Sequence, residues 1–181
     1  MDWKLFQASD FGVPQLRPRV VMVAIKREYS AGFNWPIGDR LAKSVGETLF
    51  DMMSANGWRG AKAWRDKAAK IAPTIVGGSK KHGGPDLGPT RARAAWAELG
   101  VEGRTIAETS PEKDFVGMPR LTVPMVAKLQ GFPADWHFSG GKTAMYRQVG
   151  NAFPPPVAAA VGGMIAAALL SAVPYAVQAA E

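Results

Sequence analysis

Residues 157–173 form an uncharged segment with a proline immediately on either side. The segment is short for a membrane-spanning helix, which needs about 20 apolar residues. It consists mostly of Ala and Gly rather than the Leu, Ile and Phe that favour insertion into lipid. We therefore expect no membrane association, and instead a buried helix with a small-residue face. Any fold of this chain has to supply a surface against which that helix packs.

A second apolar segment lies near the start of the chain. Residues 20–25 are a continuous run rich in β-branched side chains, typical of a strand buried on both faces in a parallel-type sheet. Just before it, Gln15, Arg17 and Arg19 alternate at period two, so in an extended chain their side chains share one face. Two prolines hinder full pairing of this segment, and we expect its polar face to line a site at a sheet edge.

The middle of the chain has the spacing of apolar residues that is typical of helices. One helix is predicted from Gly38 to a stop signal at residues 56–57, with Leu41 on its apolar side. A second helix is predicted over residues 60–72. Thr90 is expected to cap a third, shorter helix, which a glycine ends ten residues later.

Residues 73–89 are the longest Gly- and Pro-rich segment. Gly-rich backbone approaches ligands closely, and its amide groups can cradle phosphate oxygens, although a plain flexible loop is the alternative. Basic side chains occur within this segment and in the predicted helices around it. We hypothesise that they bind the phosphates of duplex DNA, a solvated surface being the alternative. They are Lys62, Arg65, Lys80, Lys81, Arg91 and Arg93.

The net charge of the chain agrees with a nucleic-acid partner. The chain has 22 Lys and Arg against 15 Asp and Glu, a formal net charge of +7, which is the sign expected of a protein that binds a polyanion. Its hydrophobic and charged fractions are those of a folded protein rather than a disordered one. The first residues lack the apolar run of a signal peptide, so a cytoplasmic location is expected.

Cysteine is absent from the whole sequence. This excludes disulfides, Cys-ligated zinc and a thiol nucleophile supplied by the chain itself. The two histidines, His82 and His137, stand far apart and have no carboxylates at ligand spacing, so no metal site is predicted.

Three motifs, in this order, resemble the late motifs of the DNA cytosine-5 methyltransferases. Residues 10–19 read Asp-Phe-Gly-Val-Pro-Gln-Leu-Arg-Pro-Arg, and residues 120–133 begin with Arg-Leu-Thr and end with Leu-Gln-Gly-Phe-Pro. Residues 146–155 read Tyr-Arg-Gln-Val-Gly-Asn-Ala-Phe-Pro-Pro. The chain departs from the usual family pattern where Pro124 and Met125 replace an Arg-Glu pair, and where a Phe replaces Val in the third motif.

The resemblance implies an α/β fold. The chain would be the C-terminal piece of a Rossmann-like methyltransferase domain plus a small mixed α/β target-recognition domain. Residues 1–30 would supply a catalytic-domain strand with the Gln-x-Arg-x-Arg motif, and residues 31–140 would form the target-recognition domain. Residues 141–181 would hold the last motif and a helix that returns to the catalytic domain.

The resemblance also implies transfer of a methyl group from S-adenosyl-L-methionine to carbon 5 of a cytosine flipped out of duplex DNA. Arg19 would point at the base and stabilise charge developing on its O2 atom, while Gln15 and Arg17 would order the surrounding site. Asn151 and Ala152 would lie near the methionine end of the cofactor.

Two elements of that chemistry are missing. The family attacks carbon 6 of cytosine with a Cys thiolate and binds its cofactor mainly on an early Gly-rich loop, and this chain has neither. The resemblance therefore implies that it is inactive unless an N-terminal methyltransferase polypeptide supplies both. Three interpretations remain open: a natural subunit of a split restriction-modification methyltransferase, the inactive product of a truncated gene, and a non-enzymatic DNA-binding protein derived from the recognition domain.

Overall fold

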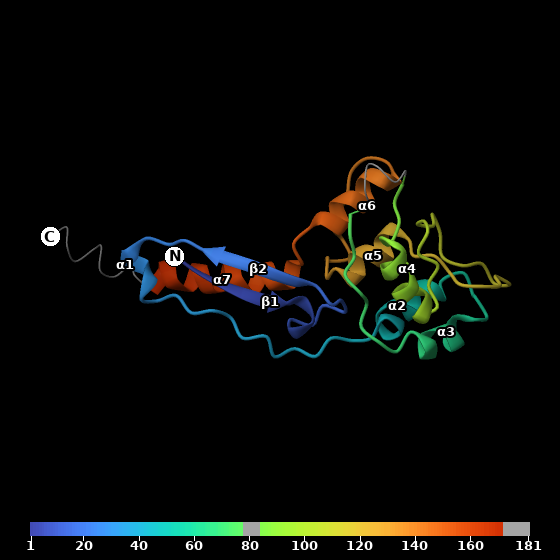
Figure 1. The fold of residues 1–181 in the computed structure, drawn as a ribbon, viewed down its shortest axis with the longest axis horizontal. Helices are drawn as coiled ribbons and strands as arrows, with labels where there is room; N and C mark the ends of the chain where they lie inside the picture. Colours follow the sequence, from blue (N-terminus) through green and yellow to red (C-terminus); the bar gives the residue numbers. More distant parts are fainter. Residues whose placement is uncertain (78–83, 172–181) are drawn as a thin grey trace.

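The computed structural model describes residues 1–77 and 84–171. Figure 1 shows an elongated molecule with two bodies at opposite ends. In the first, the hairpin body, the strands β1 (Asp2–Gln7) and β2 (Pro18–Val23) lie along helix α7 (Pro155–Ser171), with α1 (Arg27–Ser30) at its outer end. The second, the helical body, contains α2 (Val45–Met53), α3 (Ala61–Lys67), α4 (Thr90–Glu98), α5 (Val123–Leu129) and α6 (Lys142–Asn151).

The two strands of the hairpin body pair antiparallel, with Trp3 opposite Met22 and Leu5 opposite Val20. The parallel-type sheet expected from the sequence is wrong for the residues that the structure describes, in which these two strands form the whole sheet. The reason lies in the connection. Residues 8–17 begin with a single 3-10 turn and are too few for the crossover of about a dozen or more residues that parallel pairing requires.

Strand β2 is covered on one face and exposed on the other. On the inner face of the hairpin, Phe6 and Val23 pack into a core that they share with Val157 and Val161 of α7. The outer face carries four exposed large apolar side chains, those of Trp3, Leu5, Val20 and Met22. The expectation of a strand buried on both faces is therefore wrong within the described chain, because α7 supplies only one covering layer.

Helix α7 confirms the helix predicted for this part of the sequence as far as residue 171. The expected burial holds for one side only, on which Val157, Val161 and Ala168 are buried. On another side, a Cβ atom added at Gly162 or Gly163 would meet no atom within 4 Å, so this small-residue surface faces solvent.

Within residues 1–77 and 84–171, no single helix is both long enough and apolar enough to cross a membrane. Helices α6 and α7 meet the length and hydropathy requirement only when they are joined, and the pair is bent by 46° at its break. Helix α6 also belongs to the core of the helical body, to which it contributes Tyr146 and Val149.

The helical body has a core of its own, separate from that of the hairpin body. Leu49 of α2, Trp64 of α3, Trp96 of α4, Leu129 of α5 and Val149 of α6 are all buried in it. Because α6 packs in the same core as the other four helices, the helical body extends past residue 140. The mixed α/β character is confirmed, whereas the Rossmann-like origin and the division at residue 140 stay predictions.

Helix α2 begins later than the apolar spacing predicts. Leu41 is 98% exposed and lies outside the helix, which starts after Ser44. The Ser44 hydroxyl accepts a hydrogen bond from the Glu47 amide, and the Glu47 carboxylate accepts one from the Ser44 amide. This capping box satisfies backbone donors at the helix start and so fixes the start there.

Helices α3 and α4 also differ from the predicted boundaries. Helix α3 ends at Lys67, because the next residues turn to meet α2: the carbonyl groups of Ala68 and Lys70 accept hydrogen bonds from the first amides of α2. Thr90 is the first residue of α4 rather than its cap, a position taken by Pro89. Gly100, with φ of +68°, follows the end of α4, as predicted.

Candidate functional site

A buried polar network joins the two bodies. We call it the Gln15–Arg17 network, and it consists of the side chains of Gln15, Arg17 and Gln130 with the backbone around residues 75 and 149–152. Gln15 and Gln130 are completely buried, and Arg17 is 2% exposed. Buried polar groups are costly unless they are hydrogen-bonded, so these three side chains constrain the structure around them.

Arg17 holds three distant backbone segments together. Its guanidinium donates to the carbonyl oxygen of Ile75, to that of Gly150 at 2.8 Å and to that of Ala152 at 3.1 Å. Burial, together with the nearby charge of Arg19, lowers the pKa of Arg17 to about 10, so the group stays charged at neutral pH. A planar guanidinium with five donors suits this arrangement, because it can bind several acceptors at fixed angles.

Gln15 and Gln130 extend the network. The Gln15 amide nitrogen donates to the Gln130 side-chain oxygen at 2.7 Å, and the Gln15 side-chain oxygen accepts from the Ile75 amide at 2.7 Å. The Gln130 amide nitrogen in turn donates to the carbonyl oxygen of Val149 at 2.9 Å. The first, second and third motifs of the sequence are thereby connected through side chains.

Backbone contacts tighten the same junction. The Leu16 amide donates to the Ala72 carbonyl at 2.8 Å, and the Ala72 amide donates to the Pro14 carbonyl at 3.0 Å. Gly150 packs directly on Gly77, since a Cβ added at Gly150 would lie 2.5 Å from the Gly77 Cα. Glycine is therefore required at this crossing, where the start of the Gly-rich segment touches the third motif.

The predicted catalytic residues keep the period-two alternation. Gln15 and Arg17 are buried and Arg19 is half-buried, whereas the intervening residues are exposed, so the alternation is confirmed. Gln15 and Arg17 are both buried in the network, and the expectation that this face lines a site at the sheet edge stays a prediction. Arg19 differs from them, since its guanidinium donates only to the carbonyl of the adjacent Pro18, at 2.7 Å, within the described chain.

The two predicted cofactor residues lie at the end of α6. Asn151 is exposed, and its side chain lies beside Gly77. The carbonyl of Ala152 accepts a hydrogen bond from Arg17. The turn formed by these residues is therefore attached to the segment that carries Arg19, although the roles of all the predicted site residues stay predictions.

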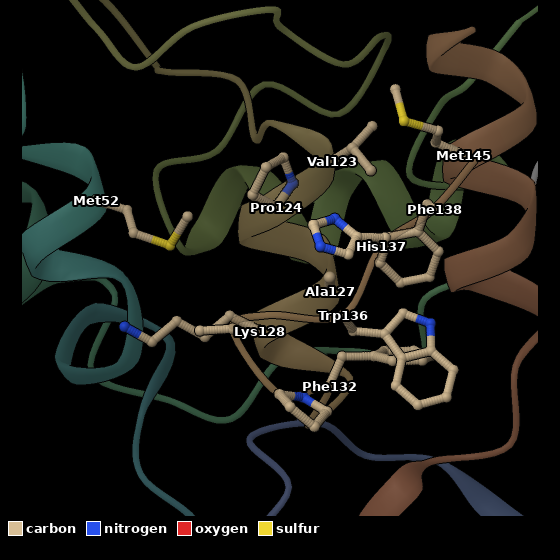
Figure 2. Close-up of a pocket in the computed structure, with 12 residues that line it drawn as sticks. Met52, Val123, Pro124, Ala127, Lys128, Phe132, Trp136, His137, Phe138 and Met145 are labelled. Atoms are coloured by element: carbon tan, nitrogen blue, oxygen red, sulfur yellow. The ribbon is translucent and has the colours of Figure 1, made fainter. Parts of the chain in front are cut away.

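An apolar pocket of about 640 Å³ opens beside α5. Figure 2 shows Phe132, Trp136 and Phe138 in its wall, and the ring centroid of Phe132 lies 5.4 Å from that of Trp136 and 5.0 Å from that of Phe138. Its polar lining residues are Lys128 and His137, with no carboxylate among the lining residues. The pocket therefore offers neither a set of metal ligands nor an acid–base pair of carboxylates.

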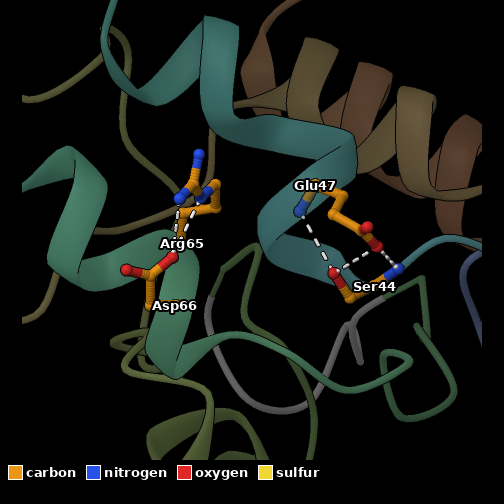
Figure 3. Close-up of polar contacts among 4 residues, drawn as sticks. All are labelled: Ser44, Glu47, Arg65 and Asp66. Atoms are coloured by element: carbon orange, nitrogen blue, oxygen red, sulfur yellow. Dashed lines mark hydrogen bonds and ion pairs between the residues drawn. The ribbon is translucent and has the colours of Figure 1, made fainter.

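The predicted DNA-binding cations occupy two helices and one undescribed segment. Lys62 and Arg65 lie on α3, where Figure 3 shows Arg65 paired with Asp66 at 2.8 Å. Arg91 is exposed on α4, and Arg93 is half-buried there. Lys80 and Lys81 lie outside the described residues. Asp66 partly neutralises the charge of Arg65, and Arg93 is half-buried. Among the predicted DNA-binding cations that the structure describes, Lys62 and Arg91 are therefore the two that are both exposed and without such an ion pair.

Sequence reasoning missed the roles of two residues. Gln130 belongs to the second motif, and no local pattern marks its hydrogen-bond partner Gln15, which lies 115 residues away. The hydroxyl of Tyr146 donates to the carbonyl of Asp86 at 2.5 Å, which ties α6 to the segment before α4. Burial raises the pKa of Tyr146 above its ordinary value, with the Asp86 charge adding to the effect, so the hydroxyl remains a donor.

Arg17 and Arg19 are expected to differ sharply in their effect on stability. Arg17→Ala leaves two buried carbonyl groups and one part-buried carbonyl group without their donor and should lower the free energy of unfolding by about 3 kcal/mol or more. Arg17→Lys keeps the charge but not the planar fork and should be nearly as damaging. Arg19→Ala is the matched control and should change stability by less than about 1 kcal/mol. Urea denaturation checks this, and similar midpoints for both Ala variants would contradict the role assigned to Arg17.

Comparison with known proteins places these features in a family. Residues 1–167 match the family model of the C-5 cytosine-specific DNA methylases. The chain is similar to the type II methyltransferase M.NaeI of Lentzea aerocolonigenes, with 58% identity over 172 residues that cover 93% of this chain and 41% of that protein. It is 52% identical to the type II methyltransferase M.NgoMIV of Neisseria gonorrhoeae over 175 residues, which cover 92% of this chain and 54% of the relative.

More distant relatives show the same partial coverage. The type II methyltransferase M.Eco47II of Escherichia coli is 29% identical over 183 residues, which cover 88% of this chain and 44% of the relative. The chain thus spans about half the length, or less, of the curated relatives that it matches. The family match extends over most of the chain and includes all three motifs. This chain belongs to the C-5 cytosine-specific DNA methylase family.

Proposed function

We propose that this chain is the C-terminal part of a type II DNA cytosine-5 methyltransferase of a restriction-modification system. It acts on duplex DNA together with an N-terminal polypeptide that carries the catalytic Cys and the main cofactor loop. Family membership, the names of the relatives and the absence of Cys support this proposal. The chain contributes DNA recognition, the arginine beside the base and the last cofactor-side turn.

One observation carries the proposal: the Gln15–Arg17 network connects the segment leading into Arg19 with the turn at residues 150–152. In a base-modifying enzyme, groups that contact the base and groups that hold the cofactor have to keep a fixed separation. Arg17 lies two residues before Arg19 and binds the carbonyl groups of Gly150 and Ala152. It therefore holds Arg19 at a fixed distance from the turn at residues 150–152. A fixed separation of this kind is expected of an enzyme that acts on the base, and it supports the enzymatic proposal.

Arg19 is the residue of this chain assigned to the chemistry. Its guanidinium is half-buried and binds only a neighbouring carbonyl, so it can turn toward a flipped cytosine without breaking the network. There it donates hydrogen bonds to O2 of the base and stabilises the negative charge that develops during attack. Gln15 and Arg17 hold the backbone on which Arg19 is presented.

The turn at the end of α6 suits the methionine end of S-adenosyl-L-methionine. Asn151 is exposed there, and its side-chain amide can donate hydrogen bonds to a carboxylate, while Ala152 adds a small side chain that leaves room for a ligand. When bound, the cofactor supplies the methyl group. Most of its binding surface belongs to the N-terminal polypeptide.

Activity is expected only when the two polypeptides are combined. The chain alone should transfer no methyl group to duplex DNA, because it lacks the nucleophile. Adding the part of M.NaeI outside the matched region, where the family's Cys is expected, should restore transfer. Incorporation of labelled methyl groups by each polypeptide and by the mixture measures this. Methylation by the purified 181-residue chain would overturn the proposal, and DNA binding without restored transfer would favour the non-enzymatic alternative.

Arg19→Ala should reduce turnover rather than docking. In the combined enzyme, loss of one donor to the developing charge should lower kcat by about 10²–10³-fold, while duplex affinity changes little. Arg59→Ala is the control, because Arg59 is an exposed arginine in the helical body, paired with Asp114 on the surface. Single-turnover kinetics and equilibrium DNA binding separate the two effects. Equal losses of affinity and turnover would make Arg19 a phosphate contact instead.

Lys80 and Lys81 are expected to bind DNA phosphates. Replacing both by Ala should weaken duplex binding and lower the slope of log affinity against log salt by about two. Lys26→Ala combined with Arg27→Ala removes the same charge at the start of α1 in the hairpin body and should leave the slope nearly unchanged (Figure 1). Titrations at several salt concentrations measure the slopes, and an unaltered slope in the Lys80 and Lys81 variant rejects the assignment.

A further inference from the structure

An open pocket of about 330 Å³ lies in the helical body, between α4 and the segment that follows it. One side of the pocket is formed by α4, which contributes the small side chains of Ala94 and Ala97. The other side is formed by residues 101–104. We call it the α4 pocket. Its charged and hydroxyl-bearing lining residues are Thr90, Arg93, Glu102 and Arg104.

Arg93 is the best-positioned cation of the α4 pocket. Its aliphatic part packs on Gly103, since a Cβ atom added at that glycine would lie 3.2 Å from the Arg93 Cγ. Its guanidinium donates only to the Thr90 hydroxyl, at 3.4 Å, among the described residues. No ion pair within the described part of the chain includes it. The side chain is therefore held at its base, while most of its donors are available to a ligand.

The segment opposite Arg93 has a defined backbone. The Glu102 amide donates to the Pro119 carbonyl at 3.0 Å, and the Leu87 amide donates to the Gly103 carbonyl at 2.9 Å. The Glu102 carboxylate accepts a hydrogen bond from the Arg104 amide at 2.8 Å. It forms no ion pair with Arg93 in the structure described. The α4 pocket thus presents a cation and a carboxylate that do not satisfy each other.

This combination suits the edge of a base pair better than a phosphate. A phosphate at Arg93 would also meet the Glu102 carboxylate, which carries the same sign of charge and would repel it. A G·C pair has both complementary groups on its major-groove edge: guanine offers acceptors at O6 and N7, and cytosine offers the donor N4. The planar fork of an arginine fits the two guanine acceptors at once, and a carboxylate accepts from the cytosine amino group.

We propose that α4 lies in the major groove of the duplex and reads one G·C pair, with Arg93 donating to guanine and Glu102 accepting from cytosine. A helix about 10–12 Å across fits a groove about 12 Å wide. The small side chains of Ala94 and Ala97 leave room for the base edges. This inference rests on the proposed function. It separates Arg93 from the phosphate contacts with which the sequence alone groups it.

The neighbouring arginine has the opposite character. Arg91 is exposed on the same helix, whereas Arg93 is half-buried. A mobile, exposed cation is suited to a phosphate, which needs charge but no fixed geometry. Arg91 therefore remains a phosphate contact, and the pair provides a matched comparison within two residues.

The first test measures base preference. The wild-type chain, alone and with the part of M.NaeI outside the matched region, selects duplexes from a library with a randomised centre. Arg93→Ala should reduce the preference for guanine at one base pair of the selected site about tenfold or more. Arg93→Lys keeps the charge but not the fork, so the preference should fall while the salt dependence changes little. Arg91→Ala should weaken binding to all sequences alike and lower the salt slope by about one.

The second test moves Arg93 without removing a polar group. Gly103→Ala places a methyl group against the Arg93 stem and should reduce the guanine preference about threefold or more, with little change in salt slope. Gly141→Ala is the control, because a Cβ atom there would meet nothing within 4 Å, and its preference should equal that of the wild type. Urea denaturation checks that each variant is folded. A wild-type preference in folded Gly103→Ala would contradict the positioning of Arg93 by Gly103.

The outcomes separate this inference from the proposed function. Equal loss of affinity for all sequences in Arg93→Ala, with a lower salt slope, would make Arg93 a phosphate contact and overturn the inference. Absence of DNA binding by the wild-type chain in both forms also overturns it. Methyl transfer by the combined enzyme with an unaltered preference in Arg93→Ala rejects base reading and leaves the proposed function standing. Loss of the guanine preference in Arg93→Ala, without methyl transfer by the wild-type mixture, keeps base reading and rejects the proposed function.

Discussion

The guanidinium of Arg17 is the interaction on which the arrangement of this molecule depends. It binds backbone carbonyl groups of Ile75, Gly150 and Ala152, which are 58, 133 and 135 residues away in the sequence. A buried cation without these acceptors would be strongly unfavourable, so the three segments and the strand that follows Arg17 are held in one relative position. The hairpin body and the helical body have separate apolar cores, and this polar network joins them.

The two bodies differ in how completely they are packed. The helical body encloses large side chains such as Trp96 and Tyr146, and its helices have defined starts, as at the Ser44 cap. The hairpin body has a single two-stranded sheet on a single helix, with apolar side chains exposed on the outer face. A two-stranded sheet on one helix buries too little apolar surface to be stable by itself. The hairpin body therefore depends on its hydrogen bonds to the helical body for a defined structure.

This division corresponds to the chemistry proposed for the chain. Recognition of a duplex requires a basic, self-contained surface, and the helical body carries the described cations assigned to DNA. Attack on cytosine requires a nucleophile and a bound cofactor in addition to Arg19, and the proposed source of the nucleophile and of most of the cofactor site is the N-terminal polypeptide. The Gln15–Arg17 network contacts both the strand segment that leads into Arg19 and the helical body. It therefore holds Arg19 in a fixed position relative to the helical body.

Local patterns in the sequence determined the features that depend on near neighbours. The alternation of Gln15, Arg17 and Arg19, the helix α7 and the glycine after α4 follow from periodicity and backbone preference over a few residues. The absence of Cys fixed which chemistry the chain lacks. Tertiary structure alone decided that Arg17 and Gln130 are buried partners of distant backbone, that β1 and β2 pair antiparallel and that Leu41 lies outside α2. These outcomes depend on hydrogen bonds and packing between segments far apart in the chain, and the energy of such contacts leaves no trace in the spacing of adjacent residues.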